Sequence, residues 1–265
     1  MVCMSNDVVS VDRDGEVAIV TLNRPERMNA VNASLRGQLT DALNTLNKAQ
    51  DVRAIVLTGQ GNRAFCSGQD LQESADMQWE NIVNWLTAQR NMYQAVRDLN
   101  KPCVAAINGV AAGAGFQLAL CADIRITAPQ TLIGQPEVKA GLASIVGSYL
   151  MTLHVGLTQN VAMSLTGELI SGQRAHDIGL VTTLAAAGEV VSVSLEKARQ
   201  LATLPATAVR VSKQRFRELT QPGFDDAVLA GVRAQLECYA DGEPQRSAQR
   251  FLASRRSASR KPDDT

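Results

Sequence analysis

The stretch INGVAAGAGFQLALCAD, residues 107–123, decides the fold of this 265-residue chain. It contains an Asn-Gly turn, two glycines that flank Ala114, and a short helical pattern with a single amide, Gln117. Residues 103–122 carry no charge and are numerous enough to span a bilayer. Because the glycines interrupt this run, the pattern predicts a buried strand, a turn and a buried helix, with no membrane insertion.

Working outward, apolar strand patterns alternate with helical ones up to residue 128, and the chain becomes mostly helical after residue 140. This order is typical of an α/β protein whose strands are buried on both faces. Asn32 is the expected N-cap of a helix whose leucines recur at helical spacing. We expect strands at 15–25, 52–61, 103–108 and 123–128, an irregular loop at 63–71, and helices at 28–48, 78–98, 145–156, 159–166, 171–178, 188–203, 206–220 and 224–239.

The overall composition excludes several classes of protein. Apolar residues make up 45% and charged residues 20% of the chain, and the formal net charge is zero. A neutral chain lacks the basic excess of a non-specific nucleic-acid binder, so no nucleic-acid partner is expected. The basic residues near the end are interpreted as a solvated, frayed tail, although a local basic patch is the alternative. They are Arg255, Arg256, Arg260 and Lys261.

The cysteines and histidines argue against disulfides and metals. The five cysteines are widely spaced without a CxxC pair, and only two histidines occur. This usage indicates reduced thiols in a cytoplasmic protein and no metal centre. The N-terminal residues also lack the pattern of a signal peptide.

Three stretches carry candidate chemistry, and the first is the loop at residues 63–71. Its small residues Cys66, Ser67 and Gly68 follow a buried strand and would let a ligand approach the backbone closely. A tight turn without any ligand explains the same residues equally well.

The second stretch is the helix start near Gly113. The first N–H groups of a helix have no internal partner, and Gly113, Ala114 and Gly115 hardly shield them. Such a turn binds an anion or a developing oxyanion. Alternatively, the glycines only allow close helix packing. Neither a complete dinucleotide fingerprint nor a phosphate-binding GxxxxGK[ST] motif is present.

The third stretch is IGQPEVKAGL, residues 133–142, where Glu137 follows a Gln-Pro turn among apolar residues. Burial there would raise the pKa of the carboxyl, which suits a proton shuttle. The alternative is a glutamate that only complements the dipole of a starting helix.

In this order and at these intervals, the stretches resemble the enoyl-CoA hydratase/isomerase family, also called the crotonase family. The resemblance extends from about residue 8 to 250. It implies a ClpP/crotonase-like fold, with a spiral of ββα units over residues 1–200 and a C-terminal helical trimerisation region over 201–265. It also implies homotrimers or homohexamers. The segments that carry it are AFCSGQDL, AINGVAAGAGFQLALCAD, IGQPEVKAGL, VTLNRPERMNAVN and LTGELISGQRAHDIGLV.

The same resemblance implies an acyl-CoA substrate, with coenzyme A as part of the thioester and no separate cofactor. It places the two backbone N–H groups of an oxyanion hole on Gln69 and Ala114. Ala114 stands where glycine is usual in the family, but only its N–H is needed. Ser67, Gly68 and Gly113 would then contact the coenzyme A or the substrate, and the basic residues of the tail are candidates for its phosphates.

Typical hydratases of this family use two glutamates. Glu137 matches the second, whereas Gln117 occupies the position of the first. An amide forms hydrogen bonds but exchanges no proton near neutral pH, so Glu137 is the expected sole acid/base. Hydration of a 2-enoyl-CoA to a 3-hydroxyacyl-CoA is the leading interpretation, and Δ3,Δ2-enoyl-CoA isomerisation is the alternative. Thioester hydrolysis, decarboxylation and a catalytically silent acyl-CoA-binding protein stay open.

The length and type of the acyl chain cannot be read from the sequence. Residues 74–93 are the expected lining of the acyl pocket, although most of their large side chains would fit a core equally well. The large side chains of that segment include Met77, Trp79, Trp85 and Met92.

Overall fold

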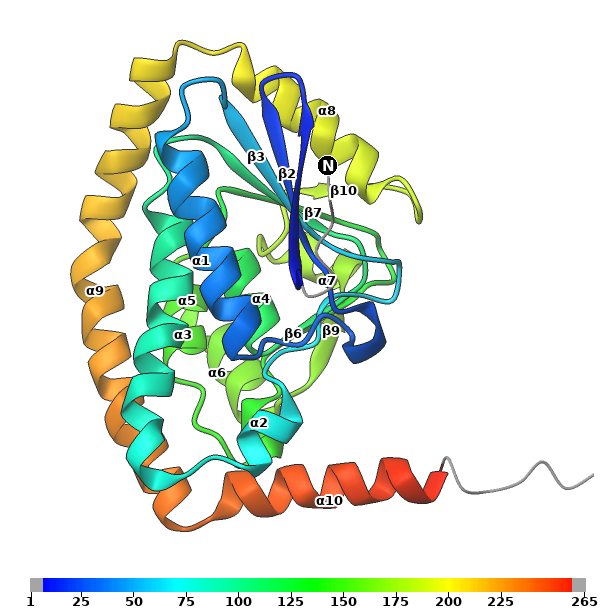
Figure 1. Ribbon diagram of the computed structural model, residues 1–265, viewed down its shortest axis with the longest axis vertical. Helices are drawn as coiled ribbons and strands as arrows, with labels where there is room; N and C mark the ends of the chain where they lie inside the picture. Colours follow the sequence, from blue (N-terminus) through cyan, green and yellow to red (C-terminus); the bar gives the residue numbers. More distant parts are fainter. Residues whose placement is uncertain (1–6, 259–265) are drawn as a thin grey trace, which may run out of the picture.

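A computed structural model describes residues 7–258, and the side chains of residues 7–253. Two β-sheets form the centre of the molecule, and a long helix runs along one side (Figure 1). Cys3, Arg260 and Lys261, together with the side chains of Arg255 and Arg256, lie outside the described residues. The predictions made for these residues therefore stay predictions.

The larger sheet has six strands, in the order β1-β2-β3-β5-β7-β10. Only β1 runs antiparallel to its neighbour; the other pairs are parallel. The strands are β1 (Val9–Asp14), β2 (Val17–Leu22), β3 (Ala54–Gly59), β5 (Cys103–Ile107), β7 (Ile124–Thr127) and β10 (Thr183–Leu184). The smaller sheet, in the order β4-β6-β8-β9, contains β4 (Ala64–Cys66), β6 (Val110–Ala112), β8 (Leu132–Gly134) and β9 (Leu169–Ser171).

The connections between the sheets produce a spiral. Strands β3, β5 and β7 of the larger sheet are each followed at once by a strand of the smaller sheet, and then by helix. Each repeat of this order is one ββα unit, as expected from the sequence. The first helices are α1 (Ala33–Lys48), α2 (Leu71–Ala75), α3 (Ile82–Arg97) and α4 (Ala114–Leu120). They are followed by α5 (Val146–Thr152), α6 (Leu157–Thr166), α7 (Gly172–Asp177) and α8 (Val190–Ala202), and short 3-10 helices span η1 (Pro25–Arg27), η2 (Trp79–Asn81) and η3 (Glu137–Ala140).

Local patterns account for much of this architecture. The Asn32 side chain accepts a hydrogen bond from the Leu35 N–H, which confirms the predicted N-cap of α1. The four leucines of α1 lie on one buried face and pack against the sheet. Strands β3 and β5 are buried over their whole length, as their continuous apolar sequences predict.

Three differences from the sequence-based assignment bear on the site and its surroundings. Residues 63–71 are not all loop, because β4 pairs there with β6. Residues 206–240 form one helix, α9 (Ala206–Ala240), which continues through Pro222. Phe224 is fully buried, and the Tyr149 hydroxyl donates to the Thr220 carbonyl at 2.6 Å, so tertiary contacts hold the helix together across the proline.

The third difference is at the C-terminal end. Helix α10 (Glu243–Ala258) replaces part of the expected frayed tail and packs against α2 and η3. Ala248 is buried in this contact. The sequence of α10 is mostly polar, so its helical state depends on the surface that it covers. Figure 1 shows α10 crossing the end of the molecule below α2.

Residues 7–258 contain neither a membrane-spanning helix nor a cluster of metal ligands. No helix in that range is long and apolar enough to cross a membrane. No group of three or more His, Cys, Asp or Glu side chains is placed there to hold a metal ion. His154 has a pKa lowered to about 4, mainly by burial, and Cys66, Cys103, Cys121 and Cys238 are free thiols.

The turn before α1 depends on Asn29, which is buried and has a φ of 54°. Its side chain accepts from the Arg24 N–H at 3.0 Å and donates to the Ala64 carbonyl at 2.8 Å, so it ties this turn to β4. Asn29→Ala should lower the free energy of unfolding by about 2–4 kcal/mol, because it leaves buried groups unpaired and adds strain at positive φ. Urea denaturation measures the loss. Asn29→Gly loses the same hydrogen bonds but adopts positive φ without strain, so it should lose about 1 kcal/mol less than Asn29→Ala. Equal losses in the two variants would contradict this explanation.

Candidate active site

The turn between β6 and α4 brings two glycines to the centre of the site. Gly113 has a φ of 51°, and a Cβ there would lie 3.2 Å from Glu137 Oε1. A Cβ on Gly115 would overlap the carbonyl oxygen of Cys66. Close packing therefore explains Gly115, whereas Gly113 leaves room beside the Glu137 carboxyl. The packing interpretation therefore holds for Gly115, and binding of an oxyanion at this turn stays a prediction.

The loop after β4 lies beside this turn. The Val31 N–H donates to the Gly68 carbonyl at 2.8 Å, and the Asp70 N–H donates to the Val31 carbonyl at 2.9 Å. Because successive peptide groups of an extended chain point to opposite sides, the Gln69 N–H points away from Val31. A Cβ on Gly68 would lie 3.8 Å from the Ala114 nitrogen, so the two loops meet here.

The Glu137 carboxyl lies against two glutamine side chains. Gln117 Nε2 donates to Glu137 Oε1 at 2.7 Å. The amide of fully buried Gln135 lies 2.6 and 2.8 Å from the two Glu137 oxygens and 3.1 Å from Gln117 Nε2. The Gln135 amide can donate its N–H to an ionised Glu137, or turn its oxygen to accept from a protonated one. The pair of amides therefore accommodates both protonation states of one carboxyl.

Burial raises the pKa of Glu137 to about 7, and hydrogen bonds from its own backbone and from Gln117 oppose part of this shift. Near neutral pH the group is thus divided between the acid and the carboxylate. This is the condition under which one side chain can both take and return a proton. The prediction of a raised pKa from the apolar surroundings is confirmed.

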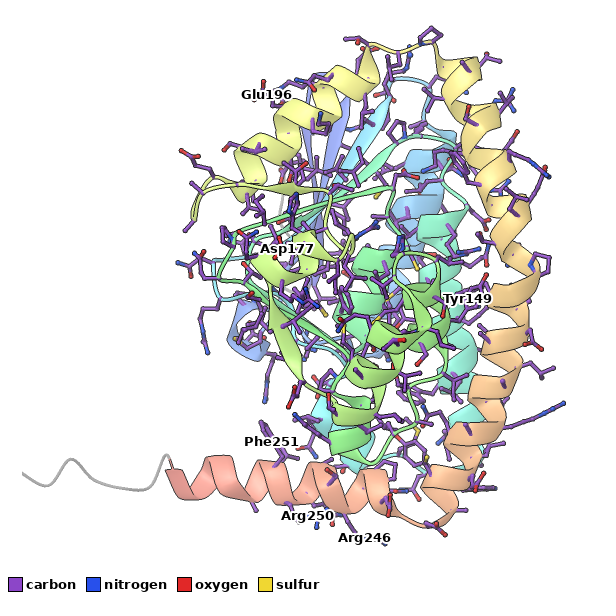
Figure 2. The ribbon with its side chains drawn as sticks, turned by 180° about the vertical axis from the view of Figure 1, so that it is seen from behind. Tyr149, Asp177, Glu196, Arg246, Arg250 and Phe251 are labelled. Carbon is purple, nitrogen blue, oxygen red and sulfur yellow. The ribbon has the colours of Figure 1, made fainter. Side chains whose placement is uncertain are left out.

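A cavity of about 340 Å³ opens in front of the carboxyl. Helices α3, α9 and α10 provide its other walls, together with α2. Phe251 lies on the side of α10 that faces the rest of the molecule (Figure 2). All seven residues singled out from the sequence line this cavity, namely Ser67, Gly68, Gln69, Gly113, Ala114, Gln117 and Glu137.

The acyl-pocket segment is only partly as expected. Ser74 and Trp85 line the cavity, but Met77 is not part of its wall. Met92 is fully buried in the core, and Trp79 is 56% exposed on the surface. Helix α3 turns only one face toward the cavity, with Trp85, Leu86, Gln89, Arg90 and Tyr93, so a continuous segment could not line it.

Sequence reasoning missed Gln135 and the cavity wall formed by α9 and α10. Gln135 stands two residues before Glu137, and an amide in a Gln-Pro pair looks like an ordinary turn residue. Its full burial beside a titratable group was the missing signal. The residues of α9 and α10 in the cavity wall include Gly231, Gln235, Ser247, Ala248 and Phe251.

The spiral of ββα units and a buried carboxyl beside two small-residue loops define a protein of the crotonase type. A family model described as enoyl-CoA hydratase/isomerase matches residues 12–259. The chain belongs to the enoyl-CoA hydratase/isomerase family, and so to a family of enzymes.

Named relatives cover nearly the whole chain. The short-chain-enoyl-CoA hydratase of Clostridium acetobutylicum is 28% identical over 252 residues, 95% of this chain and 96% of its own length. A probable enoyl-CoA hydratase of Rhodobacter capsulatus is 34% identical over 257 residues, 95% and 97% of the two chains. The crystal structure of an enoyl-CoA hydratase/isomerase from Mycobacterium paratuberculosis matches with a TM-score of 0.85 and 28% identity, covering 92% of this chain and 98% of that one. These matches confirm the predicted family and fold.

The raised pKa of Glu137 has a consequence for stability. Between pH 4.5, the ordinary pKa, and about 7, the folded protein keeps a proton that the unfolded chain releases, so stability falls as pH rises through this window. Glu137→Gln removes this loss. At pH 8 the variant should be more stable than the parent protein by roughly 1–3 kcal/mol, and at pH 4 by almost nothing.

Urea denaturation at the two pH values measures this difference. Glu168→Gln, which neutralises an exposed carboxyl, is the matched control. An equal effect of Glu137→Gln at both pH values would show that the folded protein does not disfavour the ionised carboxyl.

Proposed function

We propose that this protein hydrates a 2-enoyl-CoA to a 3-hydroxyacyl-CoA, with Glu137 as the only acid/base. The observation that carries the proposal is the single Glu137 carboxyl, with its pKa raised to about 7, at a cavity between two backbone loops. The hydratase names of the relatives support the same type of reaction. In this proposal coenzyme A is part of the substrate and no other cofactor takes part.

In the proposed reaction, the Glu137 carboxylate takes a proton from a water molecule while the oxygen of that water bonds to C3 of the enoyl group. The electrons of the double bond move toward the thioester oxygen and give an enolate. Glu137 then returns the proton to C2. The same carboxyl is base and acid in turn, which requires a pKa near the working pH.

The enolate oxygen would accept hydrogen bonds from the N–H groups of Gln69 and Ala114. Two features support this role: the Gln69 N–H points away from its neighbouring strand, and the Ala114 N–H is the first of α4, without a partner inside the helix. Fixed donors at a developing charge typically contribute about 3–4 kcal/mol each. Ser67, Gly68 and Gly113 are the proposed contacts along the thioester and the coenzyme A.

Gln117 is the proposed holder of the water. One of its N–H bonds is committed to Glu137, and its oxygen can accept from a water molecule that the carboxylate also binds. An amide cannot replace the second glutamate of typical hydratases as an acid. The proposal therefore assigns both proton transfers to Glu137.

Isomerisation between trans-3- and trans-2-enoyl-CoA is the second candidate. It also needs one carboxyl and the two N–H donors, but no bound water. The observation that favours it is that the described cavity presents Glu137 with amides and no second carboxylate.

The deciding experiment offers trans-2- and trans-3-enoyl-CoA separately in heavy water and follows the products by mass. Hydration predicts a product heavier by one water from the trans-2 substrate. Interconversion of the two substrates with uptake of deuterium alone would establish the isomerase. Tight binding of acyl-CoA without turnover of either would leave a silent homologue.

Two variants test the assigned roles. Glu137→Gln should lower kcat for hydration by about 10²–10⁴-fold with little change in acyl-CoA affinity, because the amide keeps the shape but exchanges no proton. Gln117→Leu should lower hydration by about 10-fold and spare any isomerisation, since only hydration uses the water. For the parent protein, kcat/KM should rise with pH up to about 7, as Glu137 ionises. Unchanged hydration by Glu137→Gln would overturn the assignment.

The chain is also proposed to form a homotrimer or a pair of trimers. Helix α6 presents Leu157, Val161 and Leu165 on one face, with exposed fractions of 70%, 44% and 72%. A regular apolar stripe of this kind on a helix surface is typical of an interface, here with a second copy of the chain.

Replacing Val161 and Leu165 together by lysine should convert the assembly to monomers, because the stripe would become charged. Light scattering coupled to size-exclusion chromatography gives the mass directly. Val83→Lys, at an exposed apolar residue outside residues 201–265, is the control and should leave the mass unchanged. A parent protein with the mass of a single chain would contradict the proposal.

A further inference from the structure

The cavity wall opposite the proposed oxyanion donors contains polar atoms without a hydrogen-bond partner. Ser74 and Gln89 are more than nine-tenths buried. Gln89 Oε1 is unpaired, and Ser74 Oγ has the Tyr239 hydroxyl as a neighbouring polar group. The indole N–H of Trp85 and the side-chain oxygen of Gln235 are also buried and unpaired. All four residues line the cavity. An unpaired buried polar group typically costs about 1–3 kcal/mol, so three of them in one cavity, those of Trp85, Gln89 and Gln235, need an explanation.

The four side chains come from elements that face one another. Trp85 and Gln89 are one turn apart on α3, and Gln235 lies one turn before Tyr239 on α9. The rings of Trp85 and Tyr239 meet edge to face, with centroids 6.2 Å apart. Ser74 lies beside the Tyr239 hydroxyl. These polar side chains therefore gather in one region, defined here as the polar wall: Ser74, Trp85, Gln89 and Gln235.

The polar wall is separate from the reacting centre. The Tyr93 hydroxyl reaches the Ala114 carbonyl at 3.5 Å and accepts from Gln89 Nε2 at 2.6 Å. The Gln89 amide thus lies one hydrogen bond beyond the residue that touches the proposed oxyanion loop, and Trp85 lies a further helical turn, about 6 Å, along α3. A group bound at the polar wall belongs to the distal part of the acyl chain. The hydroxyl that hydration adds at C3 would lie at Glu137 instead.

The free atoms are both donors and acceptors. One N–H of the Gln89 amide donates to the Tyr93 hydroxyl at 2.6 Å, and one N–H of the Gln235 amide donates to the Ala143 carbonyl at 2.8 Å. Each glutamine therefore offers its oxygen as an acceptor and keeps a second N–H as a donor. The Trp85 N–H can only donate, and the Ser74 hydroxyl can do either. A ligand group that matches the polar wall must donate and accept at once.

The charges beside the polar wall are already neutralised. Arg36, whose guanidinium lies 6.0 Å from the centre of the Trp85 ring, pairs with Glu73 at 2.5 Å. Arg90 pairs with Asp225 at 3.1 Å. A carboxylate bound here would face two glutamine oxygens and paired guanidinium groups. An alkyl chain would leave the unpaired atoms of Trp85, Gln89 and Gln235 without a partner.

We infer that the acyl group of the substrate carries a neutral hydroxyl distal to the double bond, and that Gln89 and Ser74 bind this hydroxyl. This inference rests on the proposed function. A hydroxyl both donates and accepts, adds no charge, and fits the acceptor and donor atoms of the polar wall. Sites built to hydrogen-bond a substrate hydroxyl discriminate strongly against the analogue that lacks it.

The test compares trans-2-enoyl-CoA substrates of five to eight acyl carbons that end in a hydroxyl, with matched chains in which a methyl replaces that hydroxyl. A third set ends in a carboxylate. At the best length, the hydroxyl substrate should have a kcat/KM about 10- to 100-fold above that of its methyl isostere, and the carboxylate should be the poorest. Gln89→Leu should abolish the preference, and Ser74→Ala should reduce it. Leu86→Met, which reshapes the same wall without removing a polar atom, should change both substrates alike.

Equal kcat/KM values for the hydroxyl and methyl chains at every length, unchanged by Gln89→Leu, would overturn the inference and leave the proposed hydration intact. A preference for the carboxylate would also overturn it. If no enoyl-CoA is turned over, the proposed function fails, and the Kd values of the saturated hydroxyl- and methyl-terminated acyl-CoAs decide the inference separately. Tighter binding of the hydroxyl chain that disappears in Gln89→Leu would support it, and equal binding would overturn it.

Discussion

The contact on which the site depends is the close approach of two backbone segments, the Cys66 carbonyl and Gly115. No side chain fits between them, so the loop after β4 and the start of α4 meet directly. This contact puts the Gln69 and Ala114 N–H groups on one side of the cavity and leaves Glu137 beside Gly113. The smaller sheet supplies the strands that end near this point, β4 at Cys66, β6 at Ala112 and β8 at Gly134.

The second constraint is the placement of an ionisable group where water is scarce. The site keeps a carboxyl that would be more stable neutral, and it surrounds that carboxyl with amides. Two glutamines cannot titrate, so they stabilise either state of Glu137 without competing for its proton. The arrangement gives up some folding free energy in exchange for a group that is poised near neutral pH.

Much of this could be read from the sequence, because it depends on local patterns. The apolar strands, the N-cap of α1, the start of a helix after Gly113 and the burial of Glu137 all follow from residue type and spacing. What could not be read depends on contacts between distant segments. Gln135 gained its role only through its burial beside Glu137, and α9 stays helical through Pro222 because Phe224 is buried. The polar sequence of α10 does not indicate that it covers a cavity.

The position of α10 bears on how the protein can be handled. This helix follows Gly242, which has a φ of 70°, and it closes one side of the cavity through Ser247, Ala248 and Phe251. The sheets and the Glu137 region are complete before it begins. A chain cut at Gly242 would therefore keep its spiral while bulk solvent reached the carboxyl. An affinity tag for purification belongs at the N-terminal end, because one fused after α10 would be attached to a helix that forms a wall of the cavity.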